Sequence, residues 1–133
     1  MTDIDIPFRW GRRNRRGGLI YYIGSPEMRR IKIGYTSGCP FKRLRALQTG
    51  SPCDLTLMIA HPGTIDDEKS LHLEFDQFSV RGEWFDMSPE LVFHVFTAVI
   101  GRFREYEEAG EEPPAWIRHR YETLIESMGV GLQ

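Results

Sequence analysis

Two short apolar segments joined by turn-forming residues constrain the fold of this chain most strongly. The first, residues 19–23, is a run of aliphatic and aromatic residues between a Gly-Gly pair and a Gly-Ser-Pro sequence. The second, residues 30–35, alternates polar and apolar residues with the period of two that is typical of a strand. Because short strands separated by a tight, turn-rich connection usually pair with each other, we predict an antiparallel hairpin here.

The pattern after the hairpin predicts helices around one further strand. Apolar residues recur every three or four positions over 40–48, which predicts a short helix, and residues 55–60 predict a third strand. A longer helix is predicted from about residue 65, and its buried side would carry Leu71, Phe75 and Phe78.

Two more helices are predicted in the C-terminal third. Ser88 followed by Pro89 resembles a helix N-cap with proline at the first helical position, and that helix would continue to about residue 106. A final amphipathic helix would span about 115–128. We therefore predict an α/β (α+β) fold, with a small three-stranded antiparallel sheet flanked by helices and a ββαβα core followed by two C-terminal helices.

The length of 133 residues favours one compact domain. We divide the chain into a basic flexible arm over 1–17, a core domain over 18–87, and a helical extension over 88–133 that packs on the core. No stretch approaches the roughly 20 apolar residues of a membrane span, and we expect no membrane association. The N-terminus lacks the pattern of a secretory signal, so a cytoplasmic protein is predicted. The two cysteines are not spaced as zinc ligands and are expected to be free thiols.

The net charge of −2 conceals a strong asymmetry along the chain. Residues 1–50 contain eleven Lys and Arg residues against three acidic ones, whereas residues 51–133 contain six against sixteen. A basic half is typical of proteins that contact nucleic-acid phosphates. The alternative is a solvated charged surface on which the basic and acidic halves of the chain neutralise each other's charge after folding. The residues predicted to bind DNA are Arg12, Arg13, Arg15, Arg16, Lys42 and Arg45, although the arm could also be a solubilising tail.

Four sequence elements in order resemble the GIY-YIG nuclease superfamily. They are Leu19-Ile20-Tyr21 with Lys32-Ile33-Gly34, the helix segment Lys42-Arg43-Leu44-Arg45, Glu68 with Leu71-His72 and Phe75, and Gly82-Glu83-Trp84-Phe85. Within this superfamily, the four elements most resemble a phage and prophage branch of the meiotically up-regulated type, which is described as a DNA-binding domain. The resemblance covers residues 18–87, so the core would be a GIY-YIG-like nuclease domain.

The resemblance implies a metal-dependent endonuclease that hydrolyses phosphodiester bonds in duplex or branched DNA. It places Mg²⁺ or Mn²⁺ on Glu68, a hard oxygen ligand that suits either ion. Tyr21 would help to deprotonate the attacking water, and Arg43 would stabilise charge on the phosphorus. His72, one helical turn after Glu68, would orient the phosphate or join proton transfer, and Glu83 could equally serve the site.

The chain departs from the family pattern mainly at Lys32, which stands where a second tyrosine is expected. Losing that phenol removes a proton-transfer group, although an ammonium there could bind phosphate. A DNA-binding module with little or no cleavage activity is therefore an alternative. Each site residue also has a purely structural interpretation, as a core tyrosine, a surface arginine, an acidic first helical turn and a packed histidine.

A third hypothesis is a protein-interaction or inhibitory factor that docks a partner through the C-terminal helices. Its basis is an apolar stripe at helical spacing, formed by Leu91, Val92, Val95, Phe96, Val99 and Phe103. The same stripe would equally cover the sheet.

Overall fold

The structure, a computed structural model, describes residues 18–129 as a five-stranded antiparallel sheet with four α-helices. The strands are β1 (Gly18–Ser25), β2 (Arg30–Thr36), β3 (Thr56–Gly63), β4 (Ser79–Arg81) and β5 (Trp84–Asp86). The helices are α2 (Pro40–Thr49), α3 (Ile65–Glu74), α4 (Pro89–Glu108) and α5 (Ala115–Ser127), with a 3₁₀ turn, η2 (Asp76–Phe78), after α3. The α+β class is confirmed, and the predicted ββαβα order followed by two helices is present.

The prediction of three strands was wrong, because β4 and β5 add a second hairpin to the sheet. The strand order is β3-β1-β2-β5-β4. Each of the two added strands has three residues, too few for an alternating pattern to be recognised in the sequence. They are joined through Gly82, whose φ of 56° is a conformation that glycine adopts without strain. This hairpin carries Glu83 to the edge of β2.

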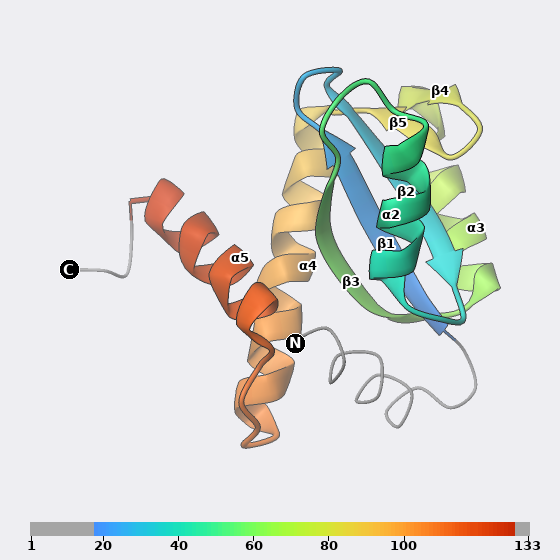
Figure 1. Ribbon diagram of the computed structural model, residues 1–133. Helices are drawn as coiled ribbons and strands as arrows, with labels where there is room; N and C mark the ends of the chain where they lie inside the picture. Colours follow the sequence, from blue (N-terminus) through green and yellow to red (C-terminus); the bar gives the residue numbers. More distant parts are fainter. Residues whose placement is uncertain (1–17, 130–133) are drawn as a thin grey trace.

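Helices pack on both faces of the sheet and along one of its strands. Figure 1 shows α2 in front of the sheet and α4 behind it, with α3 beside β2. The interior strand β1 pairs with β2 on one side and β3 on the other, and all of its residues are buried. Neighbouring residues of β1 therefore face different helical layers.

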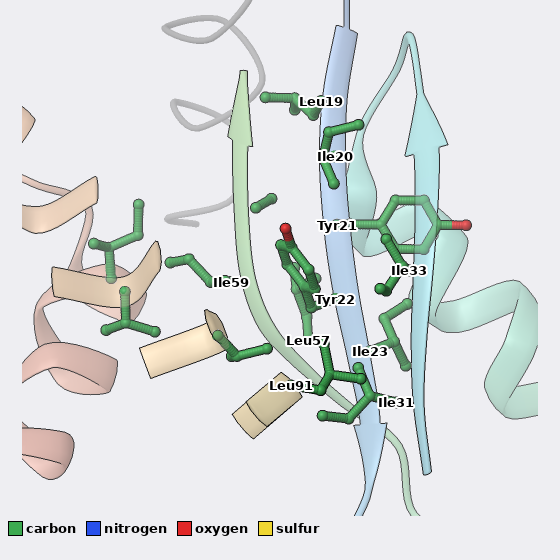
Figure 2. Packing of buried hydrophobic residues seen from close by; sticks show 14 of the residues in the cluster. Leu19, Ile20, Tyr21, Tyr22, Ile23, Ile31, Ile33, Leu57, Ile59 and Leu91 are labelled. Atoms are coloured by element: carbon green, nitrogen blue, oxygen red, sulfur yellow. The ribbon is translucent and has the colours of Figure 1, made fainter. Parts of the chain in front are cut away.

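Tyr21 and Tyr22 show this division between the two faces. Figure 2 draws their rings on opposite sides of β1, with the Tyr21 ring extending across β2. Both side chains are almost fully buried. Tyr21 is on the side of α2, whose Arg43 acts on the Tyr21 hydroxyl, whereas the Tyr22 hydroxyl contacts His94 of α4.

The predicted N-cap of α4 is present. The Ser88 hydroxyl accepts a hydrogen bond from the Leu91 backbone N–H at 3.2 Å, and Pro89 begins the helix. Four residues of the apolar stripe, Leu91, Val95, Val99 and Phe103, are buried in the core, and Val92 and Phe96 pack against it. Most of the stripe thus packs against the sheet and α5. No helix within residues 18–129 has the length and apolar character needed to cross a bilayer.

Helix α5 is attached to both α4 and the edge strand β3. The rings of Phe103 and Tyr121 stack with centroids 3.9 Å apart. Arg120 donates from Nε and Nη2 to the Leu57 carbonyl oxygen, at 3.1 and 3.0 Å. Because Leu57 belongs to β3, these bonds satisfy a carbonyl at the sheet edge.

A buried polar cluster joins α4 to the face of the sheet that carries Tyr22. The Tyr22 hydroxyl lies 3.0 Å from His61 Nε2 and 2.8 Å from His94 Nε2. His61 Nδ1 lies 3.1 Å from the Pro62 carbonyl oxygen, which can only accept, so this nitrogen carries the proton. Neutral His61 then accepts the Tyr22 proton at Nε2, and His94 donates to the Tyr22 oxygen. Burial lowers the pKa of both histidines below its ordinary value.

This cluster predicts that the free energy of unfolding decreases as the pH falls below about 6.5, the ordinary histidine value. The folded state holds His61 and His94 neutral, so the unfolded chain binds more protons in this range. Urea unfolding at pH 7.5 and pH 5.0 measures the difference. In His61→Gln, whose amide can still accept the Tyr22 proton, the decrease should be smaller, and an equal decrease in both proteins would contradict the assignment.

Candidate functional site

The candidate site begins with Tyr21, whose ring lies on the backbone of the neighbouring strand at Gly34. The two residues are directly paired between β1 and β2. A Cβ atom at Gly34 would lie 2.3 Å from Tyr21 Cζ and 2.4 Å from its Oη. Only glycine leaves room for the ring at this position. The Ile-Gly element of β2 therefore has a clear physical purpose, which is to let the phenol cross the strand.

Helix α2 supplies Arg43, whose guanidinium lies near enough to the Tyr21 hydroxyl to lower its pKa against the larger effect of burial. The helix starts at Pro40 and packs on β1 and β3, on the side of the sheet that carries Tyr21. Arg43, Lys42 and Arg45 are all exposed on this helix. Their cationic groups are accessible to an anionic ligand.

Helix α3 supplies Glu68. Two acidic residues of its first turn, Asp67 and Glu68, have different roles. Asp67 forms a capping box with Thr64, because its carboxylate accepts from the Thr64 N–H at 2.8 Å while the Thr64 hydroxyl accepts from the Asp67 N–H at 3.1 Å. Glu68 makes no such contact, and its side chain is only 13% exposed. Its carboxyl group faces the site, so Asp67 and not Glu68 satisfies the helix terminus.

His72 follows Glu68 by one helical turn and is anchored to β2. Its Nε2 lies 2.9 Å from the Ile33 carbonyl oxygen and 3.8 Å from Glu68 Oε2. Since the carbonyl oxygen can only accept, Nε2 carries the proton and a neutral His72 has its lone pair at Nδ1. The ring also packs edge-on against Phe85 at 5.1 Å. These contacts fix the orientation of the imidazole.

Lys32 lies in an ion pair that the sequence did not predict. Its Nζ is 2.5 Å from Glu83 Oε1, and the Glu83 carbonyl oxygen accepts from the Ile33 N–H at 3.0 Å. In addition to burial, the charge of Glu83 acts on the Glu68 carboxyl group and raises its pKa. Glu83 thus links the β4–β5 turn to both β2 and α3. The Gly82-Glu83-Trp84-Phe85 element was the only sequence signal for this contact.

The fold therefore gathers Tyr21, Lys32, Arg43, Glu68 and His72 from four elements, β1, β2, α2 and α3, with Glu83 from the β4–β5 turn as a sixth member. Burial raises the pKa of Tyr21, Arg43 opposes that change, and the two glutamates reinforce it. Burial and the neighbouring Glu83 also raise the pKa of Glu68, whereas His72 and Lys32 act to lower it. Negative charge on Glu68 is thus less favourable than on a solvated glutamate.

The donor set of this site fits a hard divalent cation. In the part of the chain that the structure describes, no three His, Cys, Asp or Glu residues gather as a metal site. Two adjacent carboxyl groups remain, and Mg²⁺ is commonly bound through one or two carboxylates, with water and phosphate oxygens as its other ligands. Glu68 and Glu83 match that requirement.

The predicted DNA-binding residues are only partly placed. Lys42 and Arg45 lie on the exposed face of α2 beside Arg43. The arm over 1–17, with Arg12, Arg13, Arg15 and Arg16, lies outside the described residues 18–129.

Comparison with known proteins gives one match. A family model described as the T5orf172 domain matches residues 18–100, more than half of the chain. The matched segment contains all five strands, α2, α3 and the first part of α4, and therefore every residue of the candidate site. No curated protein and no solved structure matches the chain.

Proposed function

We propose that this chain, which belongs to the T5orf172-domain family, is a divalent-metal-dependent endonuclease of the GIY-YIG type that hydrolyses DNA phosphodiester bonds. The T5orf172 domain is phage-associated and is related to nuclease-like folds. The observation that carries the proposal is the position of the Tyr21 ring over Gly34, where the charges of both Arg43 and Glu68 act on its hydroxyl group. A phenol, a guanidinium and a carboxyl group gathered in one site provide a proton-transfer group, a phosphate ligand and a metal ligand.

Glu68 would hold Mg²⁺ or Mn²⁺. When bound, such a cation would supply positive charge to the phosphoryl and leaving oxygens. Arg43 is exposed and planar, so its guanidinium can bind phosphate oxygens with two parallel hydrogen bonds while staying near the Tyr21 hydroxyl. The guanidinium thus connects the phosphate to the phenol.

Tyr21 Oη would take the proton from the attacking water. Burial disfavours its phenolate, and Arg43 is the group that lowers its pKa. The negative charges of Glu68 and Glu83 act against the phenolate, so neutralising them would make Tyr21 a better base. His72 would hold Glu68 in place while its Nδ1 stays available to accept a hydrogen bond from the substrate.

DNA, duplex or branched, is the proposed substrate. The exposed Lys42 and Arg45 flank Arg43 on α2 and could contact phosphates on either side of the scissile bond. Such contacts release counterions, so binding should weaken steeply as the salt concentration rises.

Tyr21→Phe is expected to lower the rate of plasmid nicking about a hundredfold, the usual scale for removing a proton-transfer group. The ring that fills the space over Gly34 is kept, so the fold should persist. The matched control is Tyr121→Phe, because Tyr121 lies on α5 in a ring stack that a phenylalanine preserves. The two rates are compared on supercoiled plasmid with Mn²⁺ at low salt. Equal rates in both variants would exclude Tyr21 from the chemistry.

The alternative is a DNA-binding module of the same fold without cleavage activity. The observation that favours it is the ion pair of Lys32 with Glu83, because Lys32 replaces the tyrosine of the family pattern and carries no phenol group. A wild-type protein that retards plasmid on a gel but leaves it supercoiled at every Mg²⁺ and Mn²⁺ concentration would establish this alternative.

A further inference from the structure

The β4–β5 turn carries Glu83, whose backbone and side chain both have defined partners although the side chain is partly exposed. Glu83 is held by its backbone to Ile33, and the Ile33 carbonyl in turn accepts from His72 of α3. One residue of β2, Ile33, therefore anchors both the turn that carries Glu83 and the helix that carries Glu68. This shared anchor brings the two carboxyl groups near each other, and the charge of Glu83 acts on Glu68.

Two carboxyl groups held together are electrostatically unfavourable unless a proton or a cation lies between them. In the structure one cation, the Lys32 ammonium, is bound to Glu83 Oε1, and it has no contact shorter than 4.0 Å with the Glu68 carboxylate. The Glu83 side chain is 41% exposed against 13% for Glu68, so the pair opens to solvent on the Glu83 side.

We propose that Glu83 is a second carboxylate ligand of the divalent ion that Glu68 holds, and that Lys32 is a resident counter-cation of Glu83 which opposes ion binding. This inference rests on the proposed function, because it assigns a further ligand to the same site. It gives the β4–β5 hairpin a direct place in the site. It also assigns Lys32 a role different from the proton transfer of the tyrosine that the family pattern has there.

The proposal predicts opposite effects for the two partners of the ion pair. Glu83→Gln keeps the shape and hydrogen-bonding capacity of the side chain but removes its charge, so the affinity for Mn²⁺ should fall about tenfold or more, the scale typical of disturbed metal sites. Lys32→Met removes a positive charge beside the ion and should raise the affinity severalfold. Asp66→Asn is the matched control, since Asp66 is an exposed acid on the same helix as Glu68 and should have little effect.

The experiment is calorimetric titration of the four full-length proteins with MnCl₂ alone, without DNA. As a second readout, Mn²⁺ should raise the melting temperature of the wild type more than that of Glu83→Gln, because only ligand binding to the folded state stabilises it. Weaker binding by Glu83→Gln together with tighter binding by Lys32→Met would support the proposal.

Two results would overturn it while leaving the nuclease intact. If the wild type nicks plasmid and Glu83→Gln binds Mn²⁺ as tightly as Asp66→Asn does, Glu83 is not a ligand. If Glu83→Gln and Lys32→Met weaken Mn²⁺ binding equally, the ion pair serves only to stabilise the structure. A wild type that neither binds Mn²⁺ nor nicks DNA would overturn the proposed function and this inference together.

Discussion

Glu68→Gln is expected to lower the rate of plasmid nicking by about a thousandfold, because a bound cation contributes several kcal/mol to charge stabilisation and each 1.36 kcal/mol is a factor of ten. Binding to DNA should be retained, since Arg43, Lys42 and Arg45 are unchanged. The rate and the gel shift are measured on the same plasmid with Mn²⁺.

The stability of Glu68→Gln separates loss of function from loss of fold. Burial and Glu83 raise the pKa of Glu68, so ionising this carboxyl group costs more free energy in the folded protein than in the unfolded chain. A neutral glutamine should therefore unfold at the same or a higher urea concentration than wild type. The control is Asp66→Asn, the same chemical change two residues earlier on α3, which should retain full activity. A Glu68→Gln protein that nicks at the control rate would show that Glu68 does not hold a catalytic cation.

Gly34→Ala is expected to destabilise the fold by about 3 kcal/mol, at the upper end of the usual cost of overpacking. The new methyl group would lie 2.3 Å from Tyr21 Cζ, and the Tyr21 side chain is only 2% exposed. Moving the ring would also separate Tyr21 Oη from Arg43, so nicking should fall as strongly as in Tyr21→Phe. Urea unfolding and the nicking rate measure the two effects.

Two further proteins test whether the clash with Tyr21 is the cause. Gly101→Ala lies inside α4, where an added Cβ meets nothing within 4 Å, and should stabilise the protein by about 0.5–1 kcal/mol. In a Tyr21→Leu background, Gly34→Ala should cost little, because the ring atoms that it strikes are gone. A full cost in that background would show that Gly34 is required for another reason.

Most of the fold was predictable because its elements have strong local patterns. The alternation over 30–35 and the apolar run over 19–23 identified the hairpin of β1 and β2, and the Ser88-Pro89 pair identified the start of α4. The strands β4 and β5 were not predicted, since three residues are too few to show a period. They form because β2 offers an unpaired edge and Gly82 permits the tight turn.

The candidate site was predictable only as a set of residues. Motif order suggested Tyr21, Arg43 and Glu68, but no spacing in the sequence shows that Asp67 caps α3 while Glu68 faces the sheet. The partnership of Lys32 with Glu83 joins positions 51 residues apart and depends on the unpredicted hairpin. The cluster of Tyr22 with His61 and His94 was missed for the same reason, because three distant elements supply it.

The most direct test of the central claim is incubation of the full-length wild-type protein with supercoiled plasmid at low salt, with Mn²⁺ and, in parallel, with excess chelator. We expect nicked circles with Mn²⁺, none with chelator, and none with Glu68→Gln under either condition. Plasmid that stays supercoiled in every lane, while folding of the protein is verified by its circular dichroism, would contradict the assignment of this chain as a nuclease.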